Sequence, residues 1–126
     1  MTTECGNGCE CGSGPKFVFS CSGAADVGGV VDQASRRLTA EGAGKMYCLA
    51  GIGGRVGGIV ESTKAALQVL AIDGCPLNCA KKTLEEAGFS GFDHLMIDDL
   101  GMKKGHTPVI EENIARVVSK GMEMLA

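Results

Sequence analysis

The sequence has 126 residues, of which 44% are hydrophobic and 21% are charged, a balance typical of one water-soluble globular domain. The net charge of −3, without a basic stripe, disfavours nucleic acid as a partner. No apolar run approaches the ~18 residues of a membrane span, and no secretory signal pattern is seen, so we expect a cytoplasmic protein without membrane contact.

The first half of the chain passes from an irregular segment into alternating strand and helix patterns. Residues 1–15 contain Cys and Gly but almost no apolar side chains, and we expect a flexible tail. The run FVFSC at 17–21 predicts a buried strand. Apolar residues at helical spacing predict a helix at 25–42, with Gly42 at its C-terminal end. KMYCLA at 45–50 predicts a second strand.

The middle of the chain repeats this alternation. RVGGIVESTKAA at 55–66 is a helix candidate that Gly57 and Gly58 weaken. LQVLAI at 67–72 predicts a third strand. PLNCAKKTLEEAG at 76–88 then predicts a helix that begins at Pro76.

The last two elements complete the pattern. HLMI at 94–97 predicts a fourth strand, and a final helix is expected from Thr107 as its cap, with acidic residues in its first turns. Strands that alternate with helices favour a mostly parallel sheet. We therefore predict an α/β fold with three αβα layers and a four-stranded sheet in the order 2-1-3-4, formed as one domain by residues 16–126.

The cysteines give the strongest functional signal. Seven cysteines cannot pair completely within one chain, and in a chain without an export signal they more often bind metal or perform redox chemistry. Four of them fall at predicted carboxyl ends of strands or just beyond, and neighbouring strands are ~4.8 Å apart. Four thiolates at one sheet edge suit tetrahedral zinc. The predicted ligands are Cys21, Cys48, Cys75 and Cys79.

Helix N-termini and glycine-rich loops at this edge would offer N–H groups to the anionic sulfurs, and Arg55, Lys81 and Lys82 would add positive charge. Cys75 and Cys79 alone would be a weak signal, because their spacing is not the CxxC of common zinc sites. Cys5, Cys9 and Cys11 in the tail fit a soft-metal donor or reactive thiols without a function.

Three motifs, SCSGAADVGG, CLAGIGG and DGCPLNCA, resemble in order the DGC domain family of small zinc-binding proteins over roughly residues 16–125. The resemblance implies a metal site at the same four cysteines and no defined activity. The N-terminal CGNGCECG lies outside the family's core pattern.

Other chemistries use the same residues. Cys21, between a strand and a helix N-terminus, is a candidate nucleophile for redox or sulfur-transfer catalysis, because this setting lowers a thiol pKa. An iron–sulfur cluster on the four thiolates is a further alternative. The sequence does not decide whether any reaction is catalysed.

The remaining polar candidates favour structural roles. We expect Asp73 to cap a turn or the following helix, His94 to be structural or exposed, and Asp98 and Asp99 to lie in a solvated loop. His106 lies in a loop at the predicted site's end of the sheet. GIGGRVGG matches neither the G-x-G-x-x-G pattern of dinucleotide-binding loops nor the P-loop pattern that ends in Lys-Ser/Thr.

Overall fold

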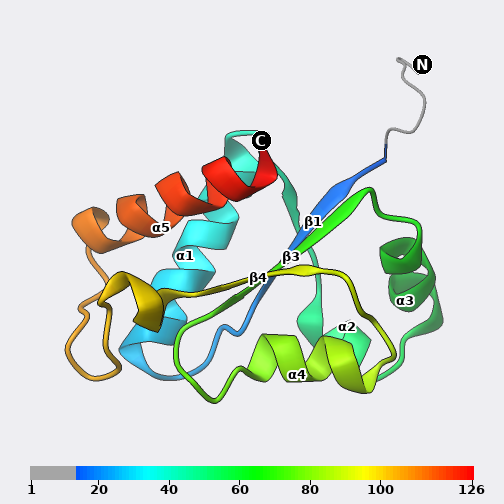
Figure 1. Ribbon diagram of the computed structural model, residues 1–126, viewed down its shortest axis with the longest axis horizontal. Helices are drawn as coiled ribbons and strands as arrows, with labels where there is room; N and C mark the ends of the chain where they lie inside the picture. Colours follow the sequence, from blue (N-terminus) through cyan, green and yellow to red (C-terminus); the bar gives the residue numbers. More distant parts are fainter. Residues whose placement is uncertain (1–13) are drawn as a thin grey trace.

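A parallel sheet with helices on both faces forms the protein (Figure 1). The computed structural model describes residues 14–126, so Cys5, Cys9, Cys11 and most of the predicted tail lie outside the described residues. The strands pair in parallel in the order β2-β1-β3-β4, which confirms the predicted fold class and strand order. Their bounds are β1 (Lys16–Ser20), β2 (Lys45–Met46), β3 (Gln68–Asp73) and β4 (Asp93–Met96).

The described residues also form five α-helices and one 3-10 helix. Their bounds are α1 (Asp26–Ala40), α2 (Leu49–Gly53), α3 (Gly57–Lys64), α4 (Cys79–Glu86), η1 (Ile97–Leu100) and α5 (Glu111–Leu125). No helix in the described range 14–126 has the length and apolarity needed to cross a bilayer.

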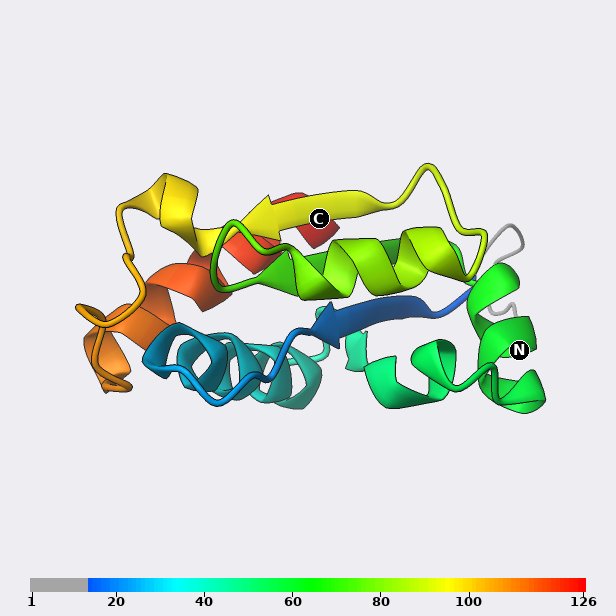
Figure 2. The same cartoon turned by 90° about the horizontal axis from the view of Figure 1, so that it is seen from below.

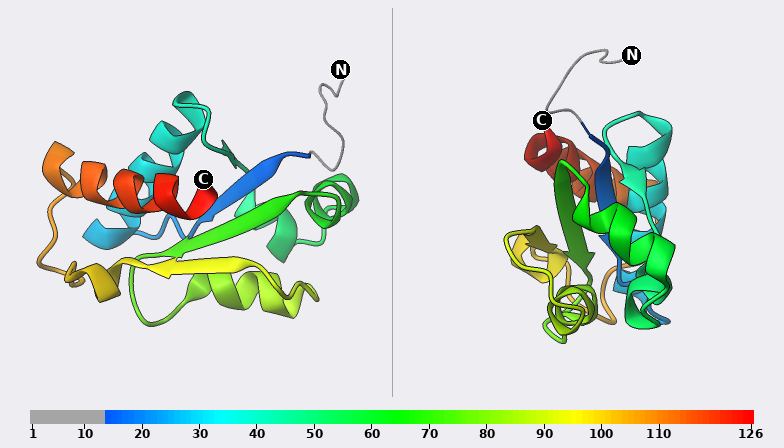
Figure 3. Two further views of the ribbon diagram at one scale, coloured as in Figure 1. Left: turned by 45° about the horizontal axis from the view of Figure 1, so that its top comes forward. Right: turned by 90° about the vertical axis from the view of Figure 1, so that its right-hand side faces the viewer.

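Alternate side chains of β1 serve two cores, because successive strand residues point to opposite faces. Val18 is fully buried beneath α1 and α5, whereas Phe19 is fully buried on the face that α2 and α4 cover. Figure 3 shows α1 and α5 on one side of the sheet and α4 on the other.

The carboxyl ends of the strands lie beside the start of α1. Figure 2 shows the arrowheads of β1 and β4 pointing toward the end where α1 begins and the loop of residues 101–110 turns back. The first turn of α1 packs tightly on the preceding loop: a Cβ on Gly28 would lie 2.4 Å from the Gly23 carbonyl oxygen. This contact requires glycine at position 28 and fixes the loop that follows β1.

The predicted strand at 45–50 was wrong beyond its first two residues. β2 ends at Met46, and residues 49–53 form α2, which the sequence did not predict. The glycines of this segment lower its helix propensity, so its sequence does not predict a helix. Gly51 nevertheless lets Ile59 of α3 pack closely, since a Cβ at position 51 would lie 2.3 Å from Ile59 Cδ1. Tertiary packing thus overrides local preference.

The predicted helix that begins at Pro76 starts later, at Cys79. The Asn78 N–H donates to the Cys75 carbonyl at 3.1 Å, so Pro76 occupies the second position of a four-residue turn, a position that its fixed φ favours. The last helix likewise starts at Glu111 and not at Thr107, whose hydroxyl donates to the Lys103 carbonyl at 2.7 Å.

Two glycine substitutions test these packing constraints. We expect Gly28→Ala to lower the free energy of unfolding by about 1–3 kcal/mol, because the methyl group overpacks the α1 start. Gly58→Ala, inside α3 with open space around the added Cβ, should raise it by about 0.5–1 kcal/mol. Urea unfolding measures both. A Gly28→Ala protein as stable as the wild type would refute the close contact.

Candidate functional site

The four candidate cysteines all lie at the carboxyl edge of the sheet. Cys21 directly follows β1, Cys75 follows β3 by two residues, and Cys79 is the first residue of α4. Cys48 follows β2 and is the N-cap of α2. All four are free thiols; Cys21 and Cys75 are half-buried, and Cys48 and Cys79 are exposed.

Three of these thiols line one cavity of about 460 Å³, which we call the thiol cavity. It lies between the end of β1, the first turn of α1 and the turn from β3 to α4. This position is the switch point of the sheet, where the connections from β1 and β3 diverge and where open α/β sheets bind ligands. Its lining also includes Lys104 from the loop 101–110 and small apolar residues.

Cys48 opens onto a neighbouring cavity of about 480 Å³, which we call the Cys48 cavity. The sulfur of Cys48 accepts a hydrogen bond from the Gly51 N–H at 3.3 Å, as an N-cap. Cys21 lines both cavities. Within residues 14–126, no three His, Cys, Asp or Glu side chains are already grouped closely enough to hold a metal ion.

Asp73 joins three elements beneath the thiol cavity. It ends β3 and is only 1% exposed. One carboxylate oxygen accepts from the Ala80 N–H at 2.7 Å, and the other accepts from the Lys81 N–H at 3.1 Å. His94 Nε2 of β4 lies 2.8 Å from that second oxygen. Asp73 therefore caps α4, as predicted, and His94 has the structural role that was expected of it.

Burial and neighbouring groups shift the pKa of the Cys21 thiol in opposite directions. Burial raises the pKa of the Cys21 thiol, and the nearby Asp73 and Cys75 raise it further. Hydrogen bonds from the Gly23 and Gly74 N–H groups lower it, but the pKa stays above its ordinary value. The prediction that this setting lowers the Cys21 pKa was therefore wrong, because desolvation outweighs the loop N–H groups.

The backbone is strained beside two of the thiols. Ser22 follows Cys21 with φ 48°, and Asn78 precedes Cys79 with φ 54°; both are left-handed conformations that non-glycine residues rarely adopt. Oδ1 of Asn78 is buried and has no hydrogen-bond partner in the described part of the chain. Such strain and unpaired polar atoms are typical of functional sites.

Lys104 is a site residue that sequence reasoning missed. Its loop is held against α1 by Asp26, whose carboxylate accepts from the Gly105 N–H at 2.9 Å and the Thr107 N–H at 3.0 Å. These hydrogen bonds, with help from nearby His106, hold the pKa of Asp26 below its ordinary value. Asp26 and Gly105 are about eighty residues apart in the sequence, so no local sequence pattern could predict their contact.

The cations predicted to balance the thiolates have other positions. The guanidinium of Arg55 donates to the Ile52, Gly53 and Glu86 carbonyl oxygens, so it joins α2 to α4 and does not line the thiol cavity. Lys81 and Lys82, on α4, are also absent from the lining of that cavity.

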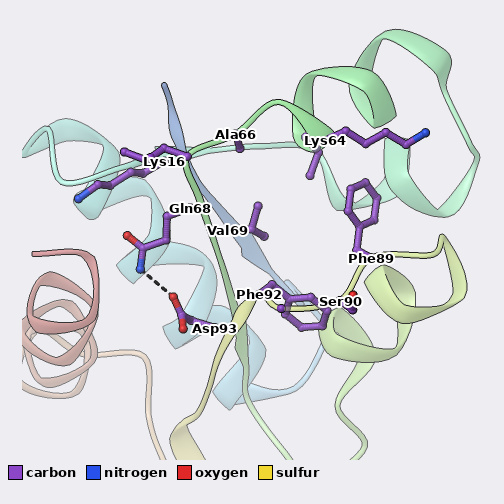
Figure 4. Close-up of a pocket in the computed structure, with 12 residues that line it drawn as sticks. Lys16, Lys64, Ala66, Gln68, Val69, Phe89, Ser90, Phe92 and Asp93 are labelled. Carbon is purple, nitrogen blue, oxygen red and sulfur yellow. Dashed lines mark hydrogen bonds between the residues drawn. The ribbon is translucent and has the colours of Figure 1, made fainter. Parts of the chain in front are cut away.

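A further cavity of about 470 Å³ lies at the opposite, amino edge of the sheet (Figure 4). Phe89, Phe92 and Val69 line it, and Gln68 donates to Asp93 at 2.7 Å beside it. The ammonium groups of Lys16 and Lys64 extend away from its centre in Figure 4. None of the described cysteines lines this cavity. The thiol cavity is therefore the stronger candidate for a functional site.

Comparisons with known proteins agree with the motifs. The family described as DGC domain matches residues 17–120. A Pseudomonas aeruginosa PAO1 protein named "Anaerobic and virulence modulator AnvM" is 34% identical over 88 residues, which make up 70% of this chain and 67% of the relative. No solved structure matches this chain.

Replacing the buried carboxylate tests its role beneath the thiol cavity. We expect Asp73→Asn to lower the free energy of unfolding by about 1–3 kcal/mol, because an amide NH₂ cannot accept and leaves a buried N–H unpaired. Asp98→Asn, which alters an exposed pair with Lys103, is the control and should change it by at most about 0.5 kcal/mol. Equal effects in urea unfolding would contradict the capping role.

The lowered pKa of Asp26 predicts a pH dependence. A carboxyl with a lowered folded-state pKa contributes its full stability above the ordinary pKa of about 3.9, and loses it as the pH falls through the folded-state pKa. Asp26→Asn should therefore be less stable than the wild type at pH 7, and this difference should shrink as the pH falls below about 4. Urea unfolding of both proteins across this range checks it; a pH-independent difference would refute the charge effect.

Proposed function

The chain belongs to the DGC domain family, and we propose that it is a metal-binding module that holds one zinc ion through Cys21, Cys48, Cys75 and Cys79. The observation that carries this proposal is the convergence of three free thiols, from two strand ends and one helix start, on one cavity at the switch point of the sheet.

The chemistry of the donor set fits a soft or borderline cation. Thiolates are preferred by zinc and by iron in clusters, and not by magnesium or calcium. The Gly23 and Gly74 N–H groups at the Cys21 sulfur suit an anionic ligand. The buried Asp73 carboxylate nearby adds negative charge, which disfavours free thiolates and favours a bound cation.

A bound zinc ion would cross-link the ends of β1 and β3 with the start of α4 and so contribute to folding stability. Among the residues, Cys21, Cys75 and Cys79 would supply the ligands from the thiol cavity, and Cys48 would supply the fourth from the neighbouring cavity. Thiolate ligands oxidise readily, so metal occupancy would depend on oxygen. The relative's printed name, an anaerobic modulator, supports a role in sensing over a purely structural role.

Elemental analysis of anaerobically purified protein tests the proposal. We expect about one zinc per chain in the wild type and less than about 0.3 in Cys75→Ser and Cys79→Ser, because each loses a ligand. Removing zinc with a chelator should lower the free energy of unfolding by about 2.7 kcal/mol, relative to protein with metal present at 100 times its dissociation constant.

The matched control replaces Cys5, Cys9 and Cys11 together by Ser, and its zinc content should equal that of the wild type. Metal-free wild-type protein, with unfolding unaffected by a chelator, would refute the proposal. Iron in the purified protein together with visible absorbance would indicate an iron–sulfur cluster in place of zinc. Full metal content in the cavity variants would remove these cysteines from the site.

A further inference from the structure

The cavity at the amino edge of the sheet, which we call the amino-edge cavity, has an aromatic wall. Its volume of about 470 Å³ lies within the range of small-molecule sites. Phe89 and Phe92 line it from the loop between α4 and β4, and Val69 lines it from β3. In Figure 4 the two rings and Val69 border a common space. The proposed metal site, at the other edge of the sheet, does not account for this cavity.

The way in which α4 ends fixes the aromatic wall. Gly88 follows the helix with φ 93°, a conformation that favours glycine. The Phe89 N–H donates to the Leu84 carbonyl at 3.0 Å. The Gly88 N–H donates to the Glu85 carbonyl at 3.0 Å. These two hydrogen bonds form a Schellman motif, which turns the chain back on the last turn of the helix. Phe89 and Phe92 both pack against the core cluster that contains Leu84, so the wall is in place before any ligand binds.

Leu67 gives the amino-edge cavity an exposed apolar rim. Its side chain lines the cavity and is 53% exposed. Its N–H donates to the Pro15 carbonyl at 2.9 Å, so its backbone is held in place. A ring bound between Leu67 and the two phenylalanines would cover apolar surface that water now contacts, which is favourable. The shape and polarity of the cavity therefore suit a small aromatic molecule.

The charged residues of the lining favour an acidic group on this molecule. Lys16 and Lys64 line the cavity, and Asp93 is the acidic residue of the lining. The Asp93 carboxylate accepts a hydrogen bond from the Gln68 amide at 2.7 Å. Figure 4 shows Gln68 and Asp93 on one side of the cavity and Lys64 on the side of Phe89. A ligand carboxylate at the Lys64 end would meet positive charge and lie away from Asp93.

Lys64 can turn toward the cavity at little cost. Its ammonium group extends away from the cavity centre in Figure 4 and pairs with Glu61 at 3.2 Å. The side chains of this pair are 59% and 72% exposed, and such a pair contributes little because water screens it. The four-carbon stem of lysine is flexible. A ligand carboxylate can therefore replace Glu61 as the partner of Lys64.

We propose that the amino-edge cavity binds a small aromatic carboxylic acid, with the ring against Phe89, Phe92 and Leu67 and the carboxylate paired with Lys64. Binding is non-covalent and requires no metal ion. This inference goes beyond the proposed metal-binding function and is independent of it, because the two sites lie at opposite edges of the sheet. The domain would then recognise an organic acid at one edge and a metal ion at the other.

Fluorescence of 2-naphthoate tests the proposal on the full chain, because a protein with no Trp and one Tyr adds little background. Its uncharged counterpart 2-naphthamide has the same ring system. We expect both probes to bind, with 2-naphthoate about threefold tighter, as for an exposed ion pair. In NMR spectra, 2-naphthoate should shift the backbone amide signals of Ser90 and Gly91 and leave those of Gly23 and Gly74, at the carboxyl edge, unchanged.

Two pairs of variants separate the apolar contact from the charge. Leu67 and Leu77 are similarly exposed, at 53% and 58%, but they line different cavities. Leu67→Ser should weaken both probes by about fivefold, and Leu77→Ser should leave both unchanged. Lys64→Gln should abolish the preference for 2-naphthoate, whereas Lys82→Gln, on α4 and outside the lining, should retain it.

The outcomes distinguish this inference from the proposed function. Cys75→Ser should bind 2-naphthoate as tightly as the wild type. A chain that lacks zinc but binds 2-naphthoate at the amino edge defeats the metal proposal alone. A chain that binds neither probe at about 10 mM defeats the inference alone. Equal affinity for the two probes, equal effects of Leu67→Ser and Leu77→Ser, or amide shifts confined to the carboxyl edge likewise overturn it.

Discussion

The carboxylate of Asp73 is the interaction on which the carboxyl edge of this protein depends. It is buried at the end of β3, and it accepts hydrogen bonds from the first turn of α4 while His94 of β4 contacts it. A buried carboxylate is costly unless donors satisfy it, so the strand end, the helix start and the neighbouring strand are held in one arrangement. Cys75 and Cys79 lie within the connection that this arrangement fixes, and the thiol cavity takes its shape from it.

The Asp73 carboxylate also affects the ionisation of the Cys21 thiol. Negative charge and burial both disfavour a free thiolate at Cys21, and the loop N–H groups compensate only in part. A cation bound among the thiols would favour the thiolate form of Cys21, because it would attract both the thiolate and the Asp73 carboxylate, which otherwise repel each other. A raised Cys21 pKa weakens the thiol-enzyme alternative, and it is one reason why we propose a metal-binding module instead.

Sequence reasoning succeeded where local pattern and packing agree. The strands at 17–21 and 67–72 have long apolar runs, and they are the two central strands that helices cover on both faces. It failed where packing overrides propensity, as at the glycine-rich α2, and where a turn competes with a helix, as at Pro76. The last helix, expected to follow Thr107, begins only at Glu111, after a loop that Asp26 ties to α1.

The sequence by itself determined the parallel order of the strands, and with it the placement of four cysteines at one edge, because alternating strand and helix patterns allow few topologies. The distribution of those cysteines between two cavities was decided only by tertiary structure. Cys48 lines the Cys48 cavity as the N-cap of α2, a short helix that the sequence did not predict and that packs closely on Ile59 at Gly51. Lys104 lines the thiol cavity because Asp26 holds its loop against α1, and such a contact between distant segments depends on the folded backbone rather than on any local run of residues.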